Sequence, residues 1–284
     1  FEKDFREAFV KGRGMRFQRR IFFASFCFLL GSWGSVALAA NADSPKPENC
    51  REWAEAPYDF GFLKNNVWNV GAAGSLAWSQ CIEPRGVDGA KQDAWSWDWP
   101  ASSRIVYGYP QIATGGNAWV GAKGSDARLP RKIADTESIQ VSYDFETDST
   151  GGYNTAATMW LVEKGLLDKS AIRTEFMIWS TWTPSSFQPG GKKRAEVEID
   201  GRVWEVWAQE NWIDGSGVNS EKWTYVAYRS KTPTNAITYD ARKLLADAAA
   251  RKLISEDYSI SGFELGNEVM GGRGKTRVKS YTLE

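Results

Sequence analysis

The 284-residue chain contains no histidine. Histidine is the side chain that most often acts as a general base near neutral pH, and it is the commonest metal ligand in proteins. Its absence excludes mechanisms that need an imidazole and any metal site built on histidine. Acid and base chemistry at neutral pH therefore falls on carboxylates, and we expect no metal.

A hydrophobic run long enough to cross a membrane is also missing. The apolar stretch at 21–30 is far shorter than the roughly 20 residues that a transmembrane anchor needs. Three arginines and Met15 precede it, and small residues follow at 36–40, an order typical of a secretory signal peptide. We expect residues 1–40, including upstream residues 1–14, to be removed from a protein that is secreted, extracellular or periplasmic in transit.

Cysteine is scarce, with three residues, and Cys27 lies inside the apolar run. The predicted mature chain therefore keeps Cys50 and Cys81. In an oxidising compartment such a pair most simply forms one disulfide, and two buried thiols are the alternative.

Neither sign of charge is in large excess. Residues 41–284 carry 28 basic and 32 acidic side chains, a net charge near −4. This balance argues against nucleic acid or an anionic membrane as a partner. There is no internal repeat, linker or second module, so we expect residues 41–284 to form a single domain, which would act as a monomer.

The stretch Thr-Glu-Phe-Met-Ile-Trp at 174–179 is rich in strand formers. Alternate side chains of a strand share a face, so Glu175, Met177 and Trp179 line one side, a combination that suits a sugar-binding surface. An edge-strand glutamate that only contacts water is the alternative interpretation.

A second strand pattern at 262–269 places Glu264 and Glu268 on one face. Two strands far apart in sequence then each carry a carboxylate in a chain with 15 tryptophans. Paired carboxylates among aromatic side chains are the arrangement that glycoside hydrolysis uses.

Short strands with frequent turn residues fill most of the rest of the chain. Residues 95–99 alternate tryptophan with polar residues and predict three indoles on one face of a strand. The pair Asp200 and Gly201 predicts a two-residue hairpin, and 240–253 predicts a helix with Asp240 as its N-cap. This pattern predicts an all-β sandwich. Further predicted strands lie at 65–69, 76–81, 104–106, 139–145, 156–162, 195–199, 202–208 and 223–229.

Seven short motifs match a known family in kind and in order. They are Asn-Asn-Val-Trp at 65–68, Ser-Gln-Cys at 79–81, Trp-Asp-Trp at 97–99, Gly-Tyr-Pro at 108–110, Ser-Tyr-Asp at 142–144, Glu-Phe-Met-Ile-Trp at 175–179 and Gly-Asn-Glu at 266–268. Together they resemble glycoside hydrolase family 12, the small β-jelly-roll endoglucanases. The resemblance implies a β-jelly-roll sandwich of two antiparallel sheets with one α-helix.

The resemblance also implies roles for single residues. Glu175 matches the nucleophile, and Glu268 matches the general acid/base in the family's Gly-x-Glu motif, in preference to Glu264. Cys50 and Cys81 match the family's disulfide. We expect the substrate-binding residues to be Asn66, Trp68, Thr158, Met177 and Trp179, with Trp68 matching the family's sugar-stacking tryptophan.

The chain departs from the family at one position. Where the family has Asn-x-Ala-x-Asp before a tryptophan, with the aspartate bonding to the nucleophile, residues 154–160 read Asn-Thr-Ala-Ala-Thr-Met-Trp. Thr158 can still donate a hydrogen bond to Glu175, but it carries no charge. This difference puts the supporting role of position 158 in question and predicts a changed pH optimum.

We therefore expect a retaining endo-β-1,4-glucanase that needs no cofactor and hydrolyses cellulose-like or mixed-linkage β-glucan through a glycosyl-enzyme intermediate. Retention would follow from two carboxyl groups about 5 to 5.5 Å apart. Xyloglucan is the alternative substrate. A non-catalytic carbohydrate-binding protein on the same kind of sandwich is the alternative class, because such proteins also line their faces with tryptophan.

Overall fold

The structure is a computed structural model that describes residues 47–122, 124, 126–213 and 220–284. The predicted signal peptide at 1–40 lies outside these residues. Within the described part of the chain, none of the helices is long and apolar enough to cross a membrane.

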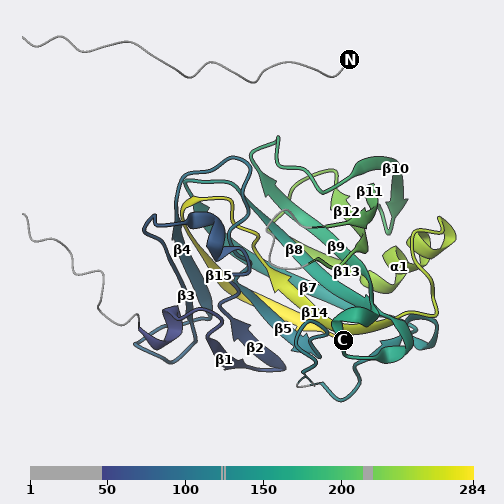
Figure 1. The fold of residues 1–284 in the computed structure, drawn as a ribbon, viewed down its shortest axis with the longest axis horizontal. Coiled ribbons are helices and arrows are strands. Elements are labelled where there is room, and N and C mark those ends of the chain that lie inside the picture. Colours follow the sequence, from purple (N-terminus) through teal and green to yellow (C-terminus); the bar gives the residue numbers. More distant parts are fainter. Residues whose placement is uncertain (1–46, 123, 125, 214–219) are drawn as a thin grey trace, which may run out of the picture. The chain divides into compact units, whose positions relative to one another are not determined.

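Two β-sheets make up the fold (Figure 1). The larger sheet has ten strands in the order β1-β2-β5-β14-β8-β9-β12-β11-β10, with β6 paired to β14. Its strands are β1 (Glu55–Tyr58), β2 (Gly61–Lys64), β5 (Gln111–Gly115), β6 (Arg131–Lys132), β8 (Tyr153–Val162), β9 (Ile172–Thr183), β10 (Lys192–Ile199), β11 (Arg202–Trp212), β12 (Trp223–Ser230) and β14 (Ser259–Gly266).

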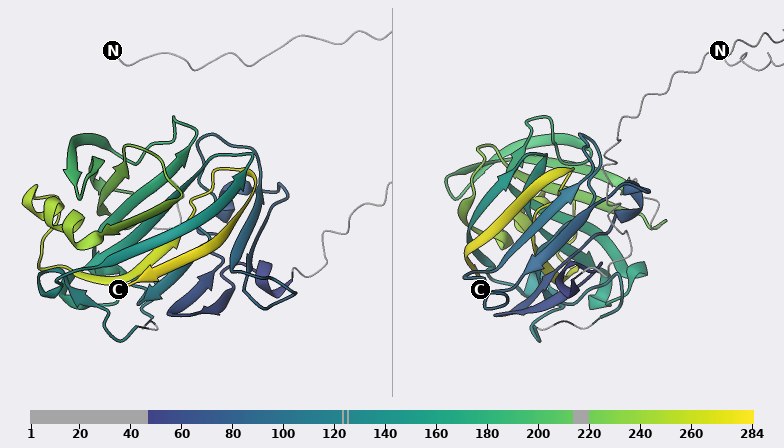
Figure 2. Two further views of the ribbon diagram at one scale, coloured as in Figure 1. Left: turned by 180° about the vertical axis from the view of Figure 1, so that it is seen from behind. Right: turned by 90° about the vertical axis from the view of Figure 1, so that its left-hand side faces the viewer.

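The smaller sheet has five strands in the order β13-β7-β15-β4-β3. Figure 2 shows its long C-terminal strand β15, in yellow, beside the earlier strands β4 and β7. Its strands are β3 (Ser79–Glu83), β4 (Ala94–Trp99), β7 (Gln140–Ser149), β13 (Ala236–Asp240) and β15 (Gly272–Leu283). The helices are α1 (Ala241–Ala250) and the short 3₁₀ turns η1 (Glu48–Cys50), η2 (Val70–Ala73), η3 (Ile133–Asp135), η4 (Glu163–Gly165) and η5 (Lys169–Ala171).

Pairing is antiparallel between neighbouring strands except at β9 and β12, which run parallel. The chain leaves β9, forms the β10–β11 hairpin and returns as β12 between β11 and β9. The two-sheet sandwich is as expected, whereas the parallel pairing of β9 with β12 departs from the antiparallel sheets that the family resemblance implied.

Apolar side chains from the inner faces of both sheets form the core. Trp95, Trp97 and Trp99 of β4 are all at most 2% exposed, as their alternation predicted. Two of the three indole N–H groups form buried hydrogen bonds. Trp95 Nε1 donates to Asn267 Oδ1 at 2.7 Å, and Trp99 Nε1 donates to Gln80 Oε1 at 3.0 Å. These indoles are structural, so tryptophan content alone does not locate the site.

The predicted hairpin and helix are confirmed, and two predicted strands are wrong. Asp200 and Gly201 have φ values of 52° and 72°, and the Asp240 side chain caps α1 by accepting from the Arg242 amide. Residues 104–106 are not a strand because Ser102 Oγ accepts their first two backbone N–H groups. Residues 65–69 form an irregular segment after β2.

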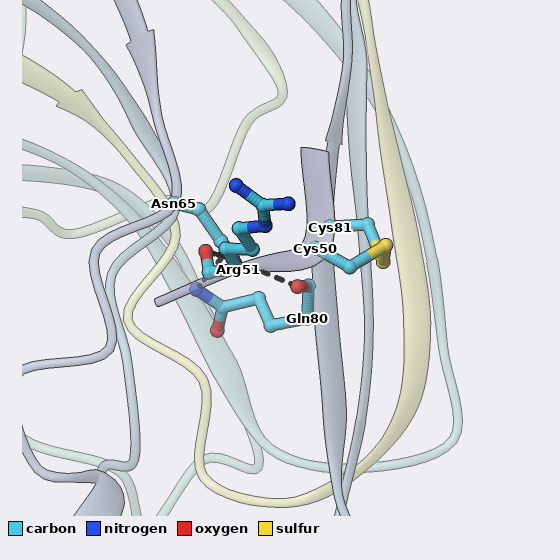
Figure 3. The surroundings of a disulfide bond; sticks show 5 residues. All are labelled: Cys50, Arg51, Asn65, Gln80 and Cys81. Carbon is cyan, nitrogen blue, oxygen red and sulfur yellow. Dashed lines mark hydrogen bonds between the residues drawn. A yellow bond between two sulfur atoms is a disulfide. The ribbon is translucent and has the colours of Figure 1, made fainter. Parts of the chain in front are cut away.

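That irregular segment is fixed next to the disulfide between Cys50 and Cys81 (Figure 3). Asn65 Nδ2 donates to the carbonyl oxygens of Arg51 and Gln80, both at 2.8 Å, and Gln80 Nε2 donates back to Asn65 Oδ1 at 2.9 Å. The disulfide and these bonds join the N-terminal segment to β3 and set the path of the chain into residues 66–68.

Candidate active site

The face of the larger sheet that points away from the core, here called the outer face, carries the predicted acids. Glu175, Met177 and Trp179 alternate along β9, while Phe176 and Ile178 between them belong to the core. Strand β8 separates β9 from β14, the strand that carries Glu264 and leads into Glu268.

Glu175 is half-buried on β9 and lies opposite Trp160 of β8 and Tyr225 of β12. Trp223 Nε1 donates a hydrogen bond to Glu175 Oε2 at 2.9 Å. The indole of Trp223 is itself held by edge-to-face contacts with Trp119 and Trp160, at centroid distances of 5.4 and 5.5 Å. A rigid donor therefore orients the carboxylate that is the predicted nucleophile.

Glu268 lies just beyond the end of β14, which finishes at Gly266, and is bound on two sides by Asn154. The Glu268 amide donates to Asn154 Oδ1 at 2.9 Å, and Asn154 Nδ2 donates to the Glu268 carboxylate. Burial raises the pKa of Glu268 to about 7, and the Asn154 hydrogen bond opposes this rise. A large share of Glu268 therefore keeps its proton at neutral pH, and most of it does below neutral pH, as a general acid must.

Two buried tyrosines connect the acids. The pKa of Tyr225 is raised well above its usual value by burial and then by the charges of Glu268 and Glu175. The pKa of Tyr109 is raised by burial and by the charges of Glu264, Glu268 and Glu175. Glu175 on β9 and Glu268 beyond the end of β14 thus both lie near enough to Tyr225 and Tyr109 to raise the pKa of each hydroxyl, while Glu264 on β14 affects Tyr109.

The levels of these acids along β8 follow from the strand register. Glu175 lies opposite Trp160, Glu264 lies opposite Thr158, and Glu268 is bonded to Asn154. Irregularities interrupt the β8–β9 ladder at Thr155/Ala156 and the β8–β14 ladder at Ile260/Phe263. Such bulges bend strands and re-aim side chains near active sites.

Met177 and Trp179 are each only 2% exposed. Trp179 Nε1 donates to Met177 Sδ at 3.5 Å, and the ring of Phe187 packs on Trp179 at 4.9 Å between centroids. Tyr225 Oη also donates to Met177 Sδ, at 3.3 Å. Both predicted substrate-binding residues therefore lie on the site's face, but as a packed floor beneath any bound sugar.

Thr158 is buried beside the site, and its hydroxyl donates to Tyr109 Oη at 3.3 Å. Tyr109 Oη in turn donates to the Ala156 carbonyl oxygen at 2.8 Å. The bond from Thr158 to Glu175 that the sequence suggested is thus replaced by one to Tyr109.

Trp68 and Asn66 lie in the irregular segment after β2. The Trp68 amide donates to Asn66 Oδ1 at 3.1 Å, and Asn66 Nδ2 donates to Gln111 Oε1 of β5 at 3.3 Å. Trp68 is half-buried and belongs to none of the apolar clusters found among the described residues. This placement leaves the indole available for a ligand.

Sequence reasoning missed four side chains that shape the site: Tyr109, Asn154, Trp223 and Tyr225. Asn154 and Tyr109 lie inside stretches that were compared with the family, so their position in those stretches could have marked them as site residues. Trp223 and Tyr225 carry no such signal, because they reach Glu175 only through the parallel pairing of β12 with β9.

A model of glycosyl hydrolase family 12 matches residues 60–284. The chain belongs to this family. It is therefore a glycoside hydrolase, and the Glu175 and Glu268 geometry above lies within the matched region.

Several known proteins are similar to this family 12 hydrolase. Endoglucanase S of Pectobacterium parmentieri is 26% identical over 226 residues, covering 78% of this chain and 81% of the relative. An endoglucanase from Rhodothermus marinus matches with a TM-score of 0.62 and 27% identity, covering 83% of this chain and 97% of that one. A family 12 xyloglucanase from Bacillus licheniformis matches with a TM-score of 0.71 and 22% identity, covering 82% and 97%, and shows the shared fold.

Proposed function

We propose that the protein is a secreted, retaining endo-β-1,4-glucanase that acts on cellulose-like or mixed-linkage β-glucan. The observation that carries this proposal is the placement of two carboxyl groups along β8, Glu175 opposite Trp160 and Glu268 bonded to Asn154, with burial raising the pKa of Glu268 to about 7. The similarity to two endoglucanases supports the choice of a β-glucan substrate.

In the proposed first step, Glu175 attacks the anomeric carbon and Glu268 gives its proton to the departing glycosidic oxygen. A covalent glycosyl-enzyme and a shortened glucan result. In the second step, ionised Glu268 takes a proton from water, the water oxygen attacks the same carbon, and the bond to Glu175 breaks. Two inversions at one carbon give net retention.

The two protonation states follow from the surroundings of each acid. Trp223 donates to Glu175, and a donor to a carboxylate favours its ionised form, as a nucleophile requires. Burial favours the protonated form of Glu268. Desolvation is thus the main cause of the raised pKa of Glu268.

The test is reducing-sugar release from carboxymethylcellulose, barley β-glucan and xyloglucan side by side. The wild-type protein should hydrolyse the first two, and Glu175→Gln and Glu268→Gln should each lower the rate by several orders of magnitude, about 10⁴-fold or more, while both remain folded. Faster hydrolysis of xyloglucan would replace the substrate assignment. Failure to hydrolyse any of the three would instead favour a binding protein.

A further inference from the structure

A third carboxylate, that of Glu264, lies on the outer face, and the two-acid mechanism does not use it. Glu264 is half-buried on β14 and lies directly opposite Thr158 of β8. Thr158 in turn lies directly opposite Met177 of β9, one same-face step from Glu175. The register therefore places Glu264 at the middle level of the site, between the levels of Glu175 and Glu268.

The surroundings of Glu264 are built from buried polar groups. Burial raises the pKa of Glu264, while the charge of Lys64 and the side chains of Gln111 and Trp160 lower it. Gln111 is fully buried, and its Oε1 accepts a hydrogen bond from Asn66 Nδ2 at 3.3 Å. Burying a carboxylate is costly unless its charge is compensated, and Lys64, itself 3.0 Å from Glu55, supplies part of that compensation.

Tyr109 connects Glu264 to the rest of the site. Its hydroxyl lies 3.3 Å from both Thr158 Oγ1 and the backbone oxygen of Glu264. Among the three acids that raise the pKa of Tyr109, Glu264 has the largest effect. Of these two cross-strand partners, position 264 on β14 carries a carboxyl group, while position 158 on β8 contributes only a hydroxyl.

We propose that Glu264, in its ionised form, provides the negative charge at the centre of this site that residue 158 does not carry. The two positions are direct cross-strand partners, so a carboxylate on either one reaches the same space from neighbouring strands. In the proposed hydrolysis this charge stabilises the positive charge that develops on the sugar ring in the transition state, without forming a bond to it. The inference rests on the proposed function.

The test moves the carboxylate between the two partners. Glu264→Gln should lower kcat/KM by roughly 100-fold, the effect of removing one preorganised electrostatic group, with little change in melting temperature. Adding Thr158→Asp to Glu264→Gln should restore at least about tenfold of that loss. The matched neutral variant, Thr158→Asn with Glu264→Gln, should restore none.

Two results would overturn the inference. One is a Glu264→Gln enzyme with kcat/KM close to the wild-type value. The other is equal activity of the Thr158→Asp and Thr158→Asn double variants when both are folded.

A second experiment does not depend on the folding of the double variants. Sodium formate should restore activity to Glu264→Ala, where a small carboxylate can enter the space that the side chain leaves, and should not restore Glu264→Gln, where the space is filled. Absence of any effect of formate on folded Glu264→Ala would contradict the inference.

Failure of the inference and failure of the proposed function are distinguishable. If Glu175→Gln and Glu268→Gln abolish hydrolysis while Glu264→Gln keeps it, only the inference fails. If Glu264→Gln abolishes hydrolysis while Glu268→Gln keeps it, Glu264 is the general acid, and both the inference and the role given to Glu268 are wrong.

Discussion

The Glu268 carboxyl illustrates how one residue's surroundings set a reaction's pH range. Burial raises its pKa to about 7, and the opposing bond from Asn154 is too weak to reverse that rise. A general acid must be protonated, so kcat/KM should fall as pH rises above about 7. The structure therefore predicts an alkaline limit close to neutral pH.

Asn154→Ala should move that alkaline limit to higher pH. The Asn154 amide stabilises the ionised form of Glu268, so its removal raises the pKa of Glu268 further. The measurement is the pH profile of kcat/KM for wild type and variant. Asn66→Ala, which changes an amide bonded to Gln111, serves as the control and should lower activity without moving this limit. A shift of the Asn154→Ala profile to lower pH would contradict the role given to Asn154.

Trp68→Ala should weaken binding without unfolding the protein. An aromatic ring stacked on a ligand contributes on the order of 1 to 3 kcal/mol, so kcat/KM on short oligosaccharides should fall more than about tenfold, and less on long polymers held at several subsites. The control is Trp97→Ala, because Trp97 is 2% exposed in the core and its loss should cost about 3 to 5 kcal/mol of stability. A melting temperature for Trp68→Ala as low as that of Trp97→Ala, with normal specific activity, would reverse the assignment.

At the scale of the element, the segment between Cys50 and Cys81 contains β1 and β2, but its site residues lie in the irregular stretch after β2. The disulfide closes a separation of 31 residues, and the bonds of Asn65 fix the segment that presents Asn66 and Trp68. The cross-link limits the conformations of the unfolded chain more than it shapes the reacting centre.

The double variant Cys50→Ser/Cys81→Ser should therefore lose about 3 to 4 kcal/mol of unfolding free energy in the chain-entropy model. Its activity at temperatures where it remains folded should stay near that of the wild type. Urea unfolding of both proteins, with and without a reductant, measures the effect. A wild-type midpoint unaffected by reductant would be inconsistent with a stabilising disulfide.

The elements that the sequence predicted well are those whose signal is local. Asp240 capping α1 and the positive φ values at Asp200 and Gly201 depend on neighbouring residues alone. The alternation along β4 correctly placed three indoles on one face, and that along β9 separated core from outer side chains, because side-chain direction follows from the strand period.

Features that depend on pairing between distant strands were out of reach of the sequence. The parallel register of β12 with β9 brings Trp223 to Glu175, and the β8–β14 register places Glu264 opposite Thr158.

The strand predicted at 104–106 is wrong for a local reason. The backbone N–H groups of residues 104 and 105 donate to Ser102 Oγ, which holds the segment in a turn. At these residues a side-chain hydrogen bond overrides the local strand pattern.

At the scale of the whole molecule, we propose export with cleavage of the leader before the mature domain. When the chain is expressed from Met15 in an exporting host, N-terminal sequencing of the secreted protein should give Ala40 or Asn41. Thiol titration of the native secreted protein should detect no free thiol, since Cys50 and Cys81 are paired. A product that retains Met15 and has titratable thiols would argue against export.

Retaining hydrolysis by the whole domain requires a covalent intermediate on one specific residue. A fluorinated cellobiosyl substrate with a good leaving group slows the second step more than the first, so the glycosyl-enzyme accumulates and its attachment site can be mapped by peptide mass spectrometry. We predict one label per protein, on the peptide that contains Glu175, and no label in Glu175→Gln. A label on Glu264 or Glu268, or no label together with an inverted product anomer in proton NMR, would contradict Glu175 as the nucleophile.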